Sequence, residues 1–282
     1  MSWALIADSS CNLRGYSPAA PDTTYCFAPL KINVAGEEFI DDEHLDVAEL
    51  NQRVANEDSA SSSSCPSIGE WADLFRQADN TIAITISENL SGSYEAAVMA
   101  RDMVMAEDGE RNIFIVNSRA AGGKLELLIM ELDQYLVAHP DATFNEITAY
   151  ICDRERTSNV LFLLSSYENL AKAGRMPKMA GILANKLNIR MLGTASSEGT
   201  IKVLGPARSQ RKAFSKIIAC MEQDGYHGGT VCIDHVFNEK AAEELGALIT
   251  QKWPEAEVHI MQCGGLCSYY AESDGLIIGY DW

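Results

Sequence analysis

TIAITISENLSGSYEAA, residues 81–97, is the most informative segment of this 282-residue chain. The apolar run 81–86 predicts a buried strand of a parallel sheet. Residues 94–106 carry alanines and methionines at helical spacing and predict a helix. The turn Ser91-Gly92-Ser93 therefore lies where a strand ends and a helix begins. The exposed N–H groups and partial positive charge of a helix start favour an anionic ligand.

The hydroxyls of this turn have a simpler explanation as well. Ser91 or Ser93 at a helix start is typical of an N-cap, in which the side chain only accepts a backbone hydrogen bond. Gly92 would let a ligand approach the backbone, whereas an N-cap needs no ligand. This segment alone does not decide between a binding site and a cap.

Composition restricts the class of protein. The formal charge of −18, without a long basic run, argues against nucleic acid and anionic membrane surfaces as partners. The N-terminal apolar run is too short for a secretory signal, and no run approaches the length of a membrane span. We therefore expect a cytoplasmic protein with no integral membrane association. We also expect its eight cysteines to be reduced thiols. Cys263 and Cys267 form a Cys-x3-Cys pair without a second ligand pair, so no metal site is expected.

The first half of the chain alternates between predicted strands and helices. Strands are predicted at 3–7 and 112–117, and a helix from 125 to 136 that stops before Pro140. This alternation predicts a parallel α/β domain. Polar residues follow two of its strands, and they are Asp8, Ser9, Ser10, Asn117 and Ser118. Such residues either line a ligand crevice or only form backbone turns.

A serine-rich segment, 59–67, precedes a second predicted helix. Serine tracts are typical of flexible linkers, but here Ser67 and Glu70 form a capping box for a helix through Trp71. We therefore expect Ser63 and Ser64 at a helix start. The extended segment 27–34 and a helix over 46–56 are predicted upstream.

The second half predicts a mixed α/β domain. Strands are expected at 160–164, 230–234 and 257–262, with a hairpin over 189–204. Helices are expected over 165–173, 178–187, 208–223 and 239–253. The polar stretch 270–275 is assigned no element. We place the boundary so that 1–157 and 158–282 form the two domains.

Familiar enzyme motifs are missing. The sequence has no P-loop, no Gly-x-Gly-x-x-Gly and no Gly-x-Ser-x-Gly. Asp234-His235 after a strand suggests a catalytic pair, although a structural histidine is the commoner explanation. No cofactor is implied.

Several motifs in the same order resemble the DegV family of bacterial fatty-acid-binding proteins. Leu90-Ser91-Gly92-Ser93-Tyr94 matches that family throughout, and the Asp8-Ser9-Ser10 turn and the 63–67 segment match in kind. Asn117-Ser118 and Gly174-Arg175 extend the resemblance over nearly the whole chain. One departure concerns the family's C-terminal histidine motif, because Tyr270 aligns near the histidine position.

The resemblance implies a two-domain carrier rather than an enzyme. Its ligand would be a long-chain fatty acid, enclosed in an apolar tunnel, with the carboxylate at the first-domain serines. Some members present the acid to a separate ATP-dependent kinase. The binding residues implied are Ser63, Ser64, Ser91, Gly92, Ser93 and Tyr270, supported by Asp8, Ser9, Ser10, Asn117, Ser118 and Arg175. Two other hypotheses stay open, a serine-dependent hydrolase or phosphotransferase acting on an acyl substrate and a scaffold with a vestigial pocket.

Overall fold

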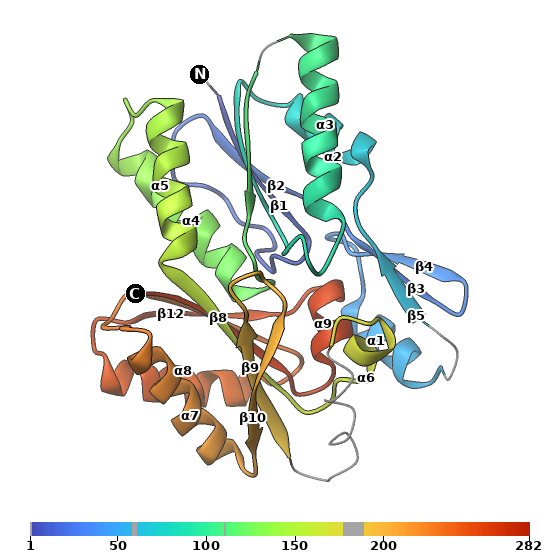
Figure 1. Ribbon diagram of the computed structural model, residues 1–282, viewed down its shortest axis with the longest axis vertical. Coiled ribbons are helices and arrows are strands. Elements are labelled where there is room, and N and C mark those ends of the chain that lie inside the picture. Colours follow the sequence, from blue (N-terminus) through green and yellow to red (C-terminus); the bar gives the residue numbers. More distant parts are fainter. Residues whose placement is uncertain (1, 58–60, 110, 177–188) are drawn as a thin grey trace.

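The computed structural model describes residues 2–57, 61–109, 111–176 and 189–282. Two sheets organise these residues, and their strands come from the two halves of the chain (Figure 1). The predicted α/β class, parallel in the first half and mixed in the second, is confirmed. The predicted helix over 178–187 lies outside the described residues.

The first sheet is parallel throughout and has the strand order β2-β1-β6-β7. Its strands are β1 (Trp3–Asp8), β2 (Thr23–Ala28), β6 (Asn80–Thr85) and β7 (Asn112–Asn117). Every residue of β6 is buried, as expected for a parallel strand covered on both faces. One face packs against α2 (Ile68–Phe75) and α3 (Ser93–Asp108), and the other packs against α4 (Gly123–Ala138).

The second sheet has the order β10-β9-β8-β13-β11-β12 and is antiparallel except between β11 and β12. Its strands are β8 (Ser158–Leu164), β9 (Arg190–Ala195), β10 (Ile201–Ala207), β11 (Thr230–His235), β12 (Glu257–Gln262) and β13 (Leu276–Asp281). Helices α7 (Gln210–Gln223) and α8 (Glu239–Lys252) cover one face, as Figure 1 shows below the sheet.

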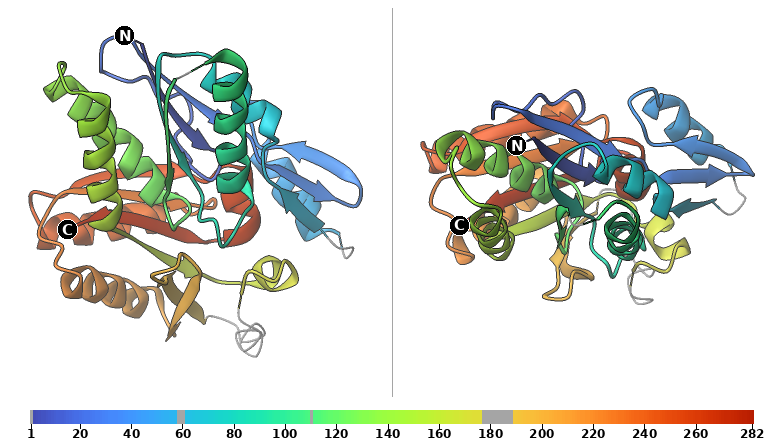
Figure 2. Two further views of the ribbon diagram at one scale, coloured as in Figure 1. Left: turned by 45° about the horizontal axis from the view of Figure 1, so that its top comes forward. Right: turned by 90° about the horizontal axis from the view of Figure 1, so that it is seen from above.

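Helix α4 lies between the two sheets and packs against both (Figure 2). Its approach to β13 requires glycine on each side. A Cβ added at Gly279 would lie 2.1 Å from the backbone C of Gly123, and one added at Gly123 would lie 2.5 Å from the Gly279 nitrogen. A shared helix makes one continuous core of the two halves. The proposed boundary near residue 157, between α5 (Phe144–Arg156) and β8, therefore stays a prediction.

A third, small sheet has the order β4-β3-β5 and lies to the right in Figure 1. It comprises β3 (Lys31–Val34), β4 (Glu37–Ile40) and β5 (Ser61–Ser64), and it packs against α1 (Val47–Ala55) and α9 (Gly265–Ala271). The short helix α6 (Glu168–Lys172) lies near α9.

The structure differs from the sequence-based assignments in three places. The serines 61–64 form strand β5 rather than a helix start, because their backbone pairs antiparallel with β3, although Ser67 and Glu70 do form the expected capping box. The segment 27–34 belongs to two strands in two different sheets, separated at Pro29 and Leu30. The first two residues of the stretch 270–275 are the end of helix α9, and β13, which follows the stretch, is a central strand of the second sheet.

Candidate ligand-binding site

Two serine-bearing segments that are distant in sequence lie side by side. A Cβ added at Gly92 would be 3.3 Å from the Cys65 sulfur, so the turn before α3 touches the chain that leaves β5. Ser63, on that strand, shares a hydrogen bond of 2.8 Å with the Tyr270 hydroxyl of α9. The expected neighbours Ser63, Gly92 and Tyr270 are therefore gathered in one region.

The Ser91–Ser93 turn is held by the buried carboxylate of Asp8. This carboxylate accepts bonds from the Ser93 hydroxyl (2.6 Å), the Ile86 N–H (2.9 Å) and both the hydroxyl and N–H of Ser10 (2.6 and 3.2 Å). Burial raises the pKa of Asp8, whereas these hydrogen bonds oppose the shift by stabilising the ionised form. Asp8 thus joins the ends of β1 and β6 to the start of α3.

Neither serine of this turn is the N-cap of α3. The cap residue is Gly92, and no side chain caps the helix there. Ser93 is fully buried and donates its proton to Asp8, which leaves none for a ligand carboxylate. Ser91 is half-buried and accepts a bond from the Ser93 N–H (3.3 Å), so its own proton remains available as a donor.

The other polar residues expected to support the site form backbone contacts. Ser9 accepts a bond from the Leu30 N–H (2.9 Å), and Ser118 bonds to the backbone of Ala120. The Asn117 oxygen accepts bonds from the N–H groups of Glu88 and Arg119. These contacts shape the turns around the site.

Ser63 and Ser64 point to opposite sides of β5. Successive side chains of a strand alternate between its faces, so Ser61 and Ser63 meet the tyrosines of α9. Ser64 is exposed. The two expected ligand contacts therefore differ, and Ser63 alone faces Tyr270.

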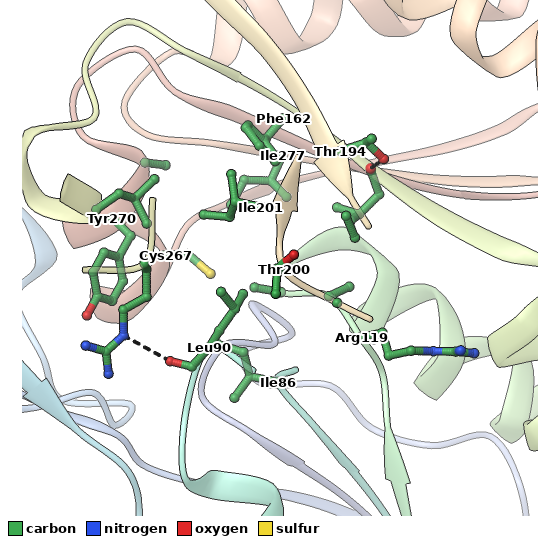
Figure 3. Close-up of a pocket in the computed structure, with 18 of the residues that line it drawn as sticks. Ile86, Leu90, Arg119, Phe162, Thr194, Thr200, Ile201, Cys267, Tyr270 and Ile277 are labelled. Atoms are coloured by element: carbon green, nitrogen blue, oxygen red, sulfur yellow. Dashed lines mark hydrogen bonds between the residues drawn. The ribbon is translucent and has the colours of Figure 1, made fainter. Parts of the chain in front are cut away.

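An apolar cavity of about 100 Å³ lies between the two sheets (Figure 3). Tyr270 and Arg119 lie on opposite sides of the cavity, with Leu90 and Thr200 between them. Most of its remaining walls come from strands of the second sheet and from α9: Val160, Phe162, Leu164, Thr194, Ile201, Leu266, Cys267 and Ile277. The sequence does carry a signal for part of this wall, since Val160, Phe162 and Leu164 alternate along β8 and so share a face.

Arg175 connects the two halves at the mouth of this cavity. Its side chain is exposed and donates to the Leu90 carbonyl (Nε–O 3.2 Å) and to the Ala173 carbonyl (2.5 Å). The Leu90 contact crosses from the end of α6 to the turn that holds Ser91. This contact joins the two halves of the chain at residues that line the cavity.

At the opposite end, Arg119 belongs to a charged cluster with Glu155 and Lys124. Glu155 pairs with Arg119 and accepts from the Lys124 ammonium (Nζ–Oε1 2.9 Å). Burial alone would raise the pKa of Glu155, but its two cationic partners outweigh burial and lower it. Arg119 is the member of this cluster that lines the cavity. No local pattern indicates the cluster, because its members are far apart in the chain.

The Asp234-His235 pair has no catalytic geometry. Asp234 accepts from the Asn12 amide (2.8 Å), whereas His235 Nδ1 faces the Asn238 N–H (3.3 Å). Asp234 is fully buried beside the equally buried Glu126. Burial, and then the charge and hydrogen bond of Glu126, raise the pKa of Asp234 well above its usual range. Their burial side by side therefore favours the protonated form of Asp234.

A wider and more polar hollow of about 790 Å³ lies at the ends of β1 and β12, lined in part by Arg14, Asp42 and Glu43. Asp41 at its wall accepts from the first N–H groups of α9, at Gly265 and Leu266. Among residues 2–57, 61–109, 111–176 and 189–282, no set of three or more His, Cys, Asp or Glu side chains has metal-binding geometry. All eight cysteines are free thiols. In the same described ranges, no helix has the length and apolarity to cross a membrane.

Comparison with known proteins agrees with this architecture. The family described as "Uncharacterised protein, DegV family" matches residues 2–280. The chain belongs to the DegV family. A DegV domain-containing protein of Streptococcus pyogenes serotype M3 is 35% identical over 281 residues, covering all of both chains.

Two solved DegV structures resemble this DegV chain closely, and each was crystallised with a fatty acid. The Fatty Acid Kinase (Fak) B3 protein of Streptococcus pneumoniae, loaded with linoleic acid, is 34% identical with a TM-score of 0.96, covering 100% of this chain and 99% of that one. A DegV family protein of Eubacterium eligens, loaded with heptadecanoic acid, is 31% identical with a TM-score of 0.94, covering 99% of each chain.

Proposed function

We propose that this protein is a non-enzymatic carrier that binds one long-chain fatty acid in the cavity between the two sheets. One observation carries the proposal: an almost entirely apolar cavity is lined by Tyr270, whose hydroxyl shares a hydrogen bond with Ser63, so each half of the chain contributes one hydroxyl. A fatty acid has the matching shape, with one polar end and a long apolar tail. The fatty acids bound by two structural neighbours support the same ligand class.

The carboxylate would be held by neutral donors. Ser63 and Tyr270 hold two hydroxyl protons, and their mutual bond uses one, so the other can donate to a carboxylate oxygen. Ser91 adds a second hydroxyl donor, and the first turn of α3 adds N–H groups near Gly92. Hydrogen bonds to an ionised group are stronger than neutral ones and offset the cost of desolvating it.

The tail would supply most of the affinity. Burying a methylene group contributes about 0.8 kcal/mol, so about a dozen contribute on the order of 10 kcal/mol before the costs of association. Pockets for drug-sized ligands typically measure about 300–1,000 Å³, more than the 100 Å³ found here. Loading would therefore move the cavity walls apart, and Arg175 bridges the two walls at the mouth.

The acid would be presented to a separate ATP-dependent fatty acid kinase in the cytoplasm. Gly92 is exposed and Ser91 half-buried, so the proposed head-group region lies near the surface. Hydroxyl and N–H donors leave a carboxylate oxygen chemically free to attack a phosphoryl group held by a partner. Similarity to the Fak B3 protein supports this role.

The test combines ligand identification with binding. Native mass spectrometry of freshly purified protein should detect a co-purified fatty acid, and delipidated protein should rebind palmitate. Ser63→Ala with Tyr270→Phe should weaken palmitate binding by about 10-fold or more, since the hydrogen-bond donor that this pair supplies to the charged group is lost. Ser62→Ala, an exposed position on the same strand, is the matched control.

Two results would contradict the carrier role. One is a clean apo mass together with no palmitate binding. The other is turnover of an acyl ester or acyl phosphate by the purified protein alone, abolished by Ser91→Ala, which would favour the hydrolase or phosphotransferase hypothesis.

A further inference from the structure

Phe162 and Gly193 form a tightly fitted pair on the wall of the apolar cavity. They are directly opposite each other on the antiparallel strands β8 and β9. A Cβ added at Gly193 would lie 2.1 and 2.2 Å from the Cζ and Cε2 atoms of the Phe162 ring. The ring therefore occupies the space that any other residue at 193 would fill.

This placement keeps the bulk of the ring against the sheet. Phe162 lines the cavity next to Ile277, its partner on β13, and away from Tyr270 (Figure 3). Its neighbours in the strand, Leu161 and Leu163, point to the opposite face and belong to the core under α7 and α8. A side chain at residue 193 would displace the Phe162 ring. Because the sheet lies behind the ring, the cavity is the nearest unfilled space into which it could move.

The hydroxyl of Thr194, next to Gly193 on β9, offers no hydrogen-bond donor to a ligand. Thr194 donates its hydroxyl to the Val160 carbonyl (2.7 Å), so its bonding capacity is directed into the sheet. Selection of a ligand at this depth must then depend on shape. In a cavity of about 100 Å³, a displaced phenyl ring would block a large share of the available path.

We infer that Phe162, lying over Gly193, sets the length of acyl chain that the cavity accepts. The inference rests on the proposed function, since it concerns the tail of the same ligand. The ring of Phe162 and the absence of a side chain at Gly193 beneath it would together determine which acyl chains fit. The hydroxyl cluster at Ser63 and Tyr270 would recognise the carboxylate of short and long acids alike.

The experiment measures binding of octanoic, lauric, palmitic and stearic acids to delipidated protein. In the wild type, affinity should rise about fourfold per added methylene until the cavity is filled. Gly193→Ala should lower palmitate affinity by about 10-fold or more and leave octanoate nearly unchanged, because one misplaced methyl group in an apolar pocket has an effect of that size.

A second substitution tests whether the ring is the cause. Phe162→Leu, with a smaller side chain, should raise stearate affinity relative to palmitate. Added to Gly193→Ala, it should restore most of the lost palmitate affinity. Recovery will be incomplete, since the added Cβ also lies 3.0 Å from the Lys202 carbonyl. Gly69→Ala is the matched control, because a Cβ there meets its nearest neighbour at 4.0 Å.

The outcomes separate the two proposals. If no variant and no wild-type sample binds any of the four acids, the proposed function fails. If the wild type binds them but Gly193→Ala keeps the wild-type ratio of palmitate to octanoate affinity, the role of Phe162 is refuted. Loss of palmitate binding in Gly193→Ala that Phe162→Leu does not relieve also refutes it. Phe162→Leu alone retains Gly193, so its chain-length profile decides the matter if Gly193→Ala does not fold.

Discussion

Replacing Asp8 tests whether one buried carboxylate organises the serine turn. Asp8 has no exposed surface and accepts four hydrogen bonds, two on each oxygen. Asp8→Ala leaves the N–H groups of Ser10 and Ile86 without their buried acceptor, at about 1–3 kcal/mol each. The hydroxyls of Ser10 and Ser93 can rotate to other acceptors. We therefore expect a loss of about 3–5 kcal/mol in the free energy of unfolding.

Urea denaturation followed by circular dichroism measures this loss. Asp8→Asn should cost less, about 1–3 kcal/mol, since its amide oxygen can still accept from Ile86 and Ser93 while its NH2 group faces the Ser10 N–H. Asp102→Ala, which breaks an exposed pair with Arg101, is the control and should change stability by less than about 1 kcal/mol. An Asp8→Ala variant within 1 kcal/mol of wild type would refute the reasoning.

Three further predictions concern other parts of the structure. Burial and the neighbouring Glu126 raise the pKa of Asp234, so above the ordinary carboxyl pKa the folded protein binds more protons than the unfolded chain. The free energy of unfolding should therefore fall as pH rises above the ordinary carboxyl pKa, by up to about 1.4 kcal/mol per pH unit. Asp234→Asn should reduce the change in urea midpoint between pH 5 and pH 8. A variant whose midpoint changes with pH as much as that of the wild type would contradict this. Gly279→Ala places a Cβ 2.1 Å from the backbone of Gly123 and should lower the free energy of unfolding by about 3 kcal/mol or more. Thermal unfolding measures this loss, and an unchanged Tm would be inconsistent with the close contact between α4 and β13. Ser67→Ala removes the N-cap of α2 and should lower the free energy of unfolding, measured by urea denaturation, by about 1 kcal/mol. An unchanged free energy of unfolding would mean that the capping box does not form in solution.

Much of the secondary structure could be predicted from local pattern. The strand at 112–117 was predicted with its observed bounds, and the capping box at Ser67 forms as expected. Apolar runs and caps are local features, because a strand or helix of this kind is stabilised by residues near each other in the chain. The family resemblance likewise depended on motifs that can be read in order.

The failures share a different cause. Ser61–Ser64 has no apolar pattern, and it is a strand only because β3 offers it a backbone partner. Strand β13 follows a polar stretch, and its central place in the sheet depends on pairing with β8 and β11. Pairing between distant segments leaves little trace in either segment alone, so context overrides propensity.

The sequence by itself determined which residues could serve a carboxylate, namely the serines of 63–64 and 91–93 and a tyrosine near the C-terminus. Only the tertiary structure decided among them. Alternation along β5 turns Ser63 toward Tyr270 and Ser64 to solvent, and Asp8 takes the Ser93 proton. The apolar cavity also belongs to the tertiary structure alone, because its walls come from the second sheet, from α9 and from the turns that follow β6 and β7. Hydroxyl chemistry is a property of single residues, whereas donor direction and enclosed space arise only when distant segments pack together.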